Sequence, residues 1–122
     1  MARTLDYFVK FLMKEDGVER DVHEASLSGA SVTRFLHQIV QLTSKTTNWQ
    51  VSFGSNFTTP TKLFLQETGG RTFTYSLSTN ARHHAVAANG FAAIHANSIT
   101  KLYLSNNGTS TTKPTIEIVA VK

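Results

Sequence analysis

The chain has 122 residues, the size of a single domain, and it contains no cysteine. The lack of cysteine excludes disulfide bridges, thiolate zinc sites and thiol catalysis. The net charge of +4 is unevenly distributed, because residues 1–24 carry six acids and four bases whereas residues 25–122 carry two acids and eight bases. Small basic surfaces are common, but an acidic segment before a basic body also suits contacts between neighbouring copies or an arm on a partner surface.

The first residues, MARTLDYFVKFLMKEDG, do not resemble a signal peptide, because Lys10 interrupts the apolar stretch and no small-residue cleavage site follows. No apolar run approaches the roughly 20 residues of a membrane span. We therefore expect a protein that is made in the cytoplasm and does not contact a membrane. The bases are dispersed rather than clustered, so nucleic-acid binding is not favoured.

Residues 7–14 and 18–25 are two extended runs separated by Asp16-Gly17. This dipeptide predicts a hairpin, because a type I′ turn needs positive φ at both central residues. Alternation places Tyr7, Val9, Phe11 and Met13 on one face and Phe8, Lys10, Leu12 and Lys14 on the other. An acidic hairpin or arm over residues 1–24 is therefore expected, with a short helix over 5–14 as the alternative.

Residues 26–31, SLSGAS, are typical of a loop, and residues 31–43 fit either a helix or a strand. The spacing of Val32, Phe35, Leu36, Ile39 and Val40 fits an amphipathic helix that Ser31 would cap. The frequent β-branched and aromatic residues, and the lack of a Gly or Asn stop, favour a strand.

Short extended runs separated by turn signals fill the rest of the chain. Residues 48–56, NWQVSFGSN, predict a strand with Trp49, Val51 and Phe53 on one face. Gly69-Gly70 and Asn89-Gly90 each predict a hairpin between their flanking strands. The alanine-rich segment 80–97 has a helix as its alternative, and residues 114–122 read as a closing strand.

These runs predict an all-β protein with seven to nine short strands, an antiparallel β-sandwich or jelly-roll-like fold. No linker or change of composition divides the chain apart from the acidic start. The expected organisation is one domain overall, with residues 1–24 as the arm and residues 25–122 as the sandwich body.

No pattern in the chain indicates catalysis, and we expect neither an enzyme nor a cofactor. There is no GxSxG, P-loop, HExxH or GxGxxG after a strand, and the glycines read as turn glycines. His83, His84 and His95 are the obvious metal ligands, but adjacent strand residues face opposite ways and no carboxylate lies between residues 68 and 116. No metal site is therefore expected.

Aromatic residues on strands leave two binding functions open. Trp49, Tyr75 and Tyr103 are candidate stacking platforms, as in a carbohydrate-binding module for receptor recognition or a single-strand nucleic-acid-binding barrel. The competing interpretation is that these rings face the core.

Residues 61–70, TKLFLQETGG, and residues 100–109, TKLYLSNNGT, repeat one pattern. In each, two leucines face the core while a lysine and an aromatic residue face outward, which predicts two hairpin strands in equivalent positions of the sandwich. An outward aromatic residue needs cover from another subunit or sheet. The candidate interface residues are Phe8, Lys10, Arg34, Lys62, Phe64, Arg71, Arg82, Lys101 and Tyr103.

The last stretch, SITKLYLSNNGTSTTKPTIEIVAVK, resembles the C-terminal hairpin of small β-sandwich proteins in the virions of tailed bacteriophages. More loosely, the likeness extends over residues 34–122 through NWQVSFG, the Thr-rich hairpins and the absence of cysteine. The resemblance implies a non-enzymatic virion component, either a capsid decoration (cement) protein or a tail-associated adaptor. It also implies a trimeric or ring-forming homo-oligomer that binds a major capsid or tail protein.

Overall fold

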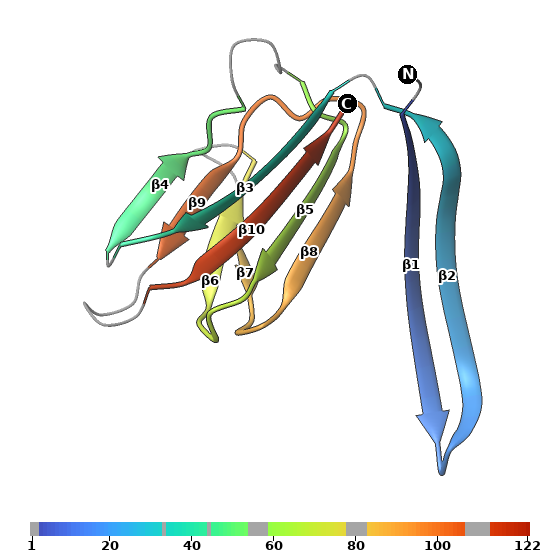
Figure 1. Cartoon of the computed structure of the whole chain (residues 1–122). Helices are drawn as coiled ribbons and strands as arrows, with labels where there is room; N and C mark the ends of the chain where they lie inside the picture. Colours follow the sequence, from blue (N-terminus) through green and yellow to red (C-terminus); the bar gives the residue numbers. More distant parts are fainter. Residues whose placement is uncertain (1–2, 33, 44, 54–58, 78–82, 107–112) are drawn as a thin grey trace. The chain divides into compact units, whose positions relative to one another are not determined.

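The computed structural model describes residues 3–32, 34–43, 45–53, 59–77, 83–106 and 113–122 (Figure 1). The chain divides into two compact units, residues 1–33 (unit 1) and residues 34–122 (unit 2). The described residues form ten strands and no helix, so the expected all-β class is confirmed.

Unit 1 is a long antiparallel hairpin of β1 (Thr4–Glu15) and β2 (Val18–Ser31). Glu15 pairs with Val18, and Asp16 and Gly17 between them have φ values of 50° and 79°. Positive φ at both central residues is the type I′ geometry that the Asp-Gly pair predicts. The hairpin is therefore confirmed, and the alternative of a helix over residues 5–14 is wrong.

The prediction of a loop over residues 26–31 is wrong, because β2 continues through this segment to Ser31. Leu5 pairs with Ala30 and Tyr7 with Leu27, so Asp6 stands opposite both Ser28 and Gly29 in a β-bulge. Gly29 N–H (2.8 Å) and Ser28 Oγ (3.1 Å) both donate to Asp6 Oδ1, and Gly29 has a φ of 69°. The loop-like composition thus encodes a bulge, and the hairpin extends seven residues beyond the expected boundary at residue 24.

Unit 2 consists of two four-stranded antiparallel sheets (Figure 1). Sheet I has the order β3 (Phe35–Gln41), β10 (Thr115–Val121), β5 (Lys62–Glu67) and β8 (Phe91–His95). Sheet II has the order β4 (Thr46–Gln50), β9 (Tyr103–Asn106), β6 (Phe73–Ser76) and β7 (His84–Val86). The ambiguous segment 31–43 is therefore a strand over most of its length, and the alanine-rich segment contains two strands rather than helices.

The strand pairing of unit 2 is nested. β3 pairs with β10, β4 with β9, β5 with β8 and β6 with β7. Successive pairs belong to alternate sheets, as if one long hairpin had been rolled up, which is the jelly-roll arrangement of eight strands. Among the described strands of unit 2, only β6 and β7 are both consecutive and paired.

Three predicted hairpins are therefore wrong. Gly69-Gly70 lies between β5 and β6, and Asn89-Gly90 lies between β7 and β8, yet each pair of strands belongs to different sheets. The same holds for β9 and β10, the strands of the C-terminal hairpin that the phage resemblance implies. A turn signal specifies that the chain reverses, but not whether the next strand pairs with the last one or crosses to the facing sheet.

A buried carboxylate organises the crossing from β5 to β6. The side chain of Glu67 is buried, with Oε2 accepting from Gly69 N–H and Oε1 from Arg71 N–H, both at 2.9 Å. Thr68 N–H donates to Thr115 O at 2.9 Å and so holds the start of this connection against β10. These bonds satisfy backbone donors at the point where the chain leaves sheet I.

The core fills the space between the two sheets, as alternation along the strands predicts. Sheet I contributes Leu63, Leu65, Ile116, Ile118 and Ala120, and sheet II contributes Phe73, Val86 and Leu104. Connecting segments add Leu42, Val51, Ile99 and Leu102. All of these buried residues belong to unit 2.

Trp49 and Val51 lie on the same side of the chain, as predicted, because Trp49 pairs with Leu104 and Val51 N–H donates to Leu102 O at 2.9 Å. β4 ends at Gln50, and its pairing with β9 is irregular between Thr46 and Trp49, where Asn48 has a φ of 50°. Val51 is buried and Phe53 packs against the core, but the Trp49 side chain is 40% exposed. β4 is an edge strand of sheet II, which leaves Trp49 partly open to solvent although it lies on the side of Val51.

Candidate interaction surfaces

One face of unit 1 carries the apolar β1 residues Val9, Phe11 and Met13, which pair with Ala25, His23 and Asp21 of β2, and we call it the hairpin surface. The pairing of β1 with β2 is regular from Tyr7 to Met13, so alternate residues of β1 point to one side. Phe11 is 69% exposed and Met13 is 64% exposed. A two-stranded hairpin has no second layer to cover such side chains, and in water it is marginally stable at best.

The opposite face of the hairpin is mixed in character. It carries the exposed Phe8, Lys10 and Leu12, and Lys10 pairs across the strands with Glu24. Near the turn, Arg20 Nε lies 3.6 Å from Glu15 Oε2, and both side chains are largely exposed. Exposed ion pairs of this kind add little stability. The candidates Phe8 and Lys10 are therefore exposed, but they lie on the polar side of the arm.

A second apolar surface covers the outer face of sheet I. Hydrogen-bonded register aligns His37, Val119, Phe64 and Ala93 in one row across β3, β10, β5 and β8. The next row is Ile39, Glu117, Gln66 and Phe91. We call these two rows, together with Phe35, the sheet I outer face.

Large apolar side chains on this face lie open to solvent. Ile39 is 66% exposed and Phe91 is 62% exposed, and Phe35 at the start of β3 is also exposed. The Phe64 and Phe91 rings stack with centroids 6.1 Å apart and planes at 26°. Ile39 and Phe91 lie on the two edge strands of sheet I, with Glu117 and Gln66 between them in the same row, so the exposed apolar groups flank a polar centre.

One ion pair crosses the sheet I outer face. His37 Nε2 lies 2.8 Å from Glu117 Oε1, with both side chains partly exposed. This pair lies between Ile39 and Val119, so the apolar surface has a polar centre.

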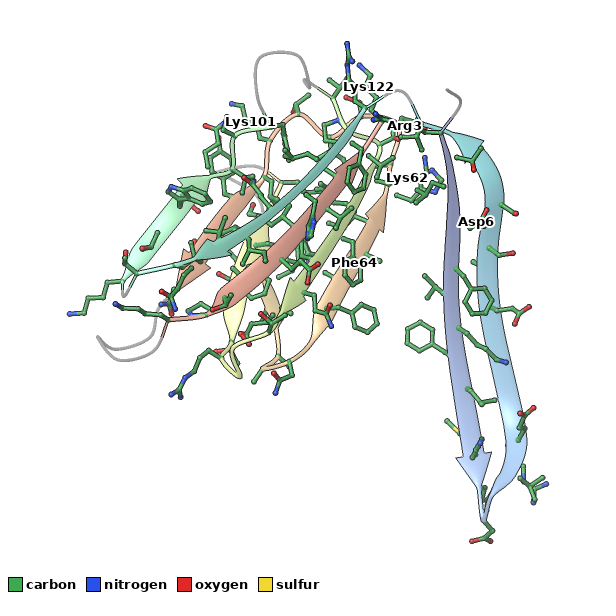
Figure 2. All side chains as sticks on the ribbon, viewed as in Figure 1. Arg3, Asp6, Lys62, Phe64, Lys101 and Lys122 are labelled. Atoms are coloured by element: carbon green, nitrogen blue, oxygen red, sulfur yellow. The ribbon has the colours of Figure 1, made fainter. Side chains whose placement is uncertain are left out.

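The repeated TKL-aromatic-L pattern has two different outcomes. Lys62 and Phe64 follow one another on the outer side of β5 and are half-buried, as predicted (Figure 2). Lys101 is exposed, but Tyr103 is only 6% exposed although it alternates with the core residue Leu104. Tyr103 therefore cannot present its ring to a partner, and its assignment as an interface or stacking residue is wrong. Strand phase gives the side to which a residue points, but not what packs on that side.

The remaining candidate bases lie at opposite ends of unit 2. Arg34 extends the β3–β10 ladder through backbone bonds with Lys122, at 3.2 Å and 3.0 Å, and it is exposed. Lys62, Lys101 and Lys122 lie at this same end (Figure 2), which we call the basic end. Arg71, which follows β5, is exposed at the other end, and Arg82 lies outside the described residues.

The stacking candidates do not form a binding platform. Trp49 is exposed on β4, whereas Tyr75 on β6 is half-buried against the core with its ring centroid 5.2 Å from that of His84. Burial raises the pKa of the Tyr75 phenol. β9 lies between the two rings, because both residues pair with Leu104. The carbohydrate and nucleic-acid alternatives need several exposed rings, and of these three candidates only Trp49 is exposed.

His83 and His84 are adjacent residues at the start of β7, His95 ends β8, and all three are exposed. No three His, Asp or Glu side chains of the described residues are grouped closely enough to hold a metal ion. The same part of the chain contains no helix of the length and apolarity needed to cross a bilayer.

Sequence reasoning missed the most exposed residues of the sheet I outer face. The alternation of Phe35, His37 and Ile39 with Leu36, Gln38 and Val40 is readable, but both sets are largely apolar. Which set faces the core depends on the partner strand β10, whose register brings Leu36 and Val40 inward.

Comparisons with protein-family models, with curated proteins and with solved structures found no significant match to this chain.

Proposed function

We propose that this protein is a non-enzymatic structural protein that assembles with further copies of itself and uses unit 1 as its assembly arm. The observation that carries the proposal is the hairpin itself. Its strands have 12 and 14 residues, yet none of their described side chains belongs to the buried core. An extended ribbon that presents bare aromatic and aliphatic side chains on both faces requires a partner surface.

The assembly that we propose is the virion of a tailed bacteriophage, where the protein acts as a capsid decoration protein or a tail-associated adaptor. The proposal comes from the sequence likeness of residues 98–122 to virion β-sandwich proteins, although β9 and β10 belong to different sheets and do not form the hairpin that this likeness implies. The jelly-roll arrangement, which recurs among viral capsid domains, is consistent with it. The binding partner would then be a major capsid or tail protein, and attachment would use buried area and hydrogen bonds rather than chemistry.

The assembly role is tested by the solution mass of the full chain and of a variant that lacks residues 1–33. The cut belongs at residue 33, because a cut at residue 24 would leave half of β2 without its partner strand. Unit 2 contains every buried core residue, so we expect the shortened chain to fold. Light scattering should show an oligomer for the full chain and a monomer for the variant. Equal masses for the two chains would contradict the role of the arm.

The virion role has a separate test. Tailed particles purified from the source of this chain should contain its peptides in a fixed ratio to the major capsid or tail protein, measured by mass spectrometry. Particles in which the chain is absent, or present only in traces, would rule out this location.

A further inference from the structure

We infer that the hairpin surface of one copy packs on the sheet I outer face of a second copy, and that the exchange is reciprocal. This inference rests on the proposed homo-assembly and names the two surfaces that would meet. It makes the hairpin a third layer on the neighbouring sandwich.

The first argument is the match in chemical character. The hairpin surface presents Phe11 and Met13, and the sheet I outer face presents Ile39 and Phe91, all more than half exposed. Sheet faces pack about 10 Å apart with interdigitating side chains, so a ribbon with alternate apolar residues is a suitable cover for such a face. The contact would remove both exposed apolar surfaces from water.

The second argument is area. β10 has seven residues, so the face is roughly 24 Å long at about 3.4 Å per residue. A two-stranded ribbon with its side chains is roughly 10 Å wide, so one contact covers roughly 480 Å² on the two partners together. That area is typical of a weak crystal contact, whereas a reciprocal pair reaches roughly 960 Å², above the ~800 Å² of most crystal contacts and just below the ~1,000 Å² at the lower limit of biological interfaces. A two-fold dimer that exchanges both arms therefore fits better than a one-way contact.

The third argument is charge. Unit 1 has six acids and four bases, a net charge of −2, whereas unit 2 has two acids and eight bases, a net charge of +6. Glu15, Asp16 and Glu19 gather at the hairpin turn, and Arg34, Lys62 and Lys122 gather at the basic end of sheet I. Opposite charges favour the orientation in which the hairpin turn points to the basic end.

The experiment uses crosslinking, for which this chain is well suited because it has no native cysteine. Phe11→Cys and Ile39→Cys are made in separate full-length chains, mixed, and treated with a short bis-maleimide. We expect a covalent heterodimer that mass spectrometry identifies by a linked peptide joining positions 11 and 39. Trp49→Cys replaces Ile39→Cys as the matched control, because Trp49 is exposed on sheet II, and it should give no linked peptide.

The orientation is tested in the same way. Glu15→Cys mixed with Arg34→Cys should crosslink, whereas Glu15→Cys mixed with Arg71→Cys should not, because Arg71 lies at the opposite end of unit 2. The reverse result would overturn the orientation.

Affinity gives an independent measurement. Ile39→Glu and Met13→Glu should each raise the dimer dissociation constant about tenfold or more, because each buries an unpaired carboxylate. Trp49→Glu should leave it unchanged. An oligomer whose mass is insensitive to Ile39→Glu, and whose mixed chains do not crosslink, would overturn this inference and leave the assembly role intact. A chain that is monomeric at all concentrations would overturn both.

Discussion

The hairpin of unit 1 and the sandwich of unit 2 use the same structural element, the antiparallel strand pair, with opposite results. β1 and β2 form the longest ladder among the described residues, and none of their described side chains belongs to the buried core. β5 has six residues, and its inward side chains Leu63 and Leu65 are completely or almost completely buried.

The difference shows that backbone pairing defines a shape, while a second layer supplies the stability. Burial of apolar area is the main favourable term in folding, and a net hydrogen bond adds only about 1 kcal/mol. A sheet facing another sheet gains that burial within its own chain. A single ribbon has no facing sheet of its own, and the proposed assembly role of the hairpin rests on this difference.

The largest expected contrast is in hydrogen exchange. In dilute, monomeric protein, the amides of β1 and β2 should exchange with opening free energies near 0 kcal/mol, while those of β5 and β10 should approach the global value of about 5–15 kcal/mol. Mass spectrometry of peptides from each strand measures both. Comparable protection of β1 and β10 in the monomer would show that the hairpin has a stabilising layer of its own.

The same substitution should have very different effects in the two units. Leu65→Ala should lower the free energy of unfolding of unit 2 by about 2–5 kcal/mol, because it opens a cavity in the core. Leu12→Ala on the exposed face of the hairpin should change it by less than about 0.5 kcal/mol. Urea denaturation of the monomer measures the free energy of unfolding of both variants. Similar losses for Leu65→Ala and Leu12→Ala would contradict the division into a stable sandwich and a hairpin that adds no stability of its own.

Glu67→Gln tests whether the sheet-to-sheet crossing needs its buried carboxylate. The variant keeps one acceptor oxygen where two backbone N–H groups now donate, so we expect a loss of about 1–3 kcal/mol. Glu117→Gln is the matched control, because its partly exposed pair with His37 should contribute at most about 1 kcal/mol. A larger loss in the free energy of unfolding for Glu117→Gln than for Glu67→Gln, measured by urea denaturation, would contradict this prediction.

Gln38→Leu should stabilise the sandwich by about 1 kcal/mol. Gln38 alternates with Leu36 and Val40 on the inner side of β3, and its Nε2 atom is buried without a hydrogen-bond partner among the described residues. Replacement by leucine removes the desolvation cost of that amide. The midpoint of thermal unfolding measures the effect, and it should rise for Gln38→Leu. Gln41→Leu, at an exposed position of the same strand, is the control and should not raise it.

The smallest effect concerns alkaline pH. Burial raises the pKa of Tyr75 above its ordinary value of 10.0, so the unfolded chain loses this proton before the folded chain does. The folded state binds more protons at that pH, and stability therefore falls as the pH rises above about 10. Tyr75→Phe should remove this part of the pH dependence while leaving the free energy of unfolding at pH 7 nearly unchanged. If the free energy of unfolding falls equally above pH 10 in the original chain and in the Tyr75→Phe variant, Tyr75 does not contribute to this loss of stability.

Local signals in the sequence predicted the first turn and the class of fold. Asp16-Gly17 specified a type I′ turn, and period-two alternation around Leu63, Leu65, Ile116 and Ile118 specified inward and outward sides of strands. These features depend only on neighbouring residues and on the geometry of an extended chain. The outward position of Phe64 followed from the same alternation.

The tertiary structure decided which strands pair and therefore which surfaces remain bare. Gly69-Gly70 and Asn89-Gly90 encode chain reversals, but the nested pairing of β3 with β10 and of β5 with β8 turns them into crossings between sheets. That pairing places Ile39 and Phe91 on the face where Phe64 lies, whereas Tyr103, at the matching position of the repeat, is buried in the other sheet. The sequence by itself determined an all-β chain with an acidic hairpin. The apolar face that we propose receives this hairpin exists only because strands far apart in the sequence lie side by side, and contacts between distant residues have no local signature.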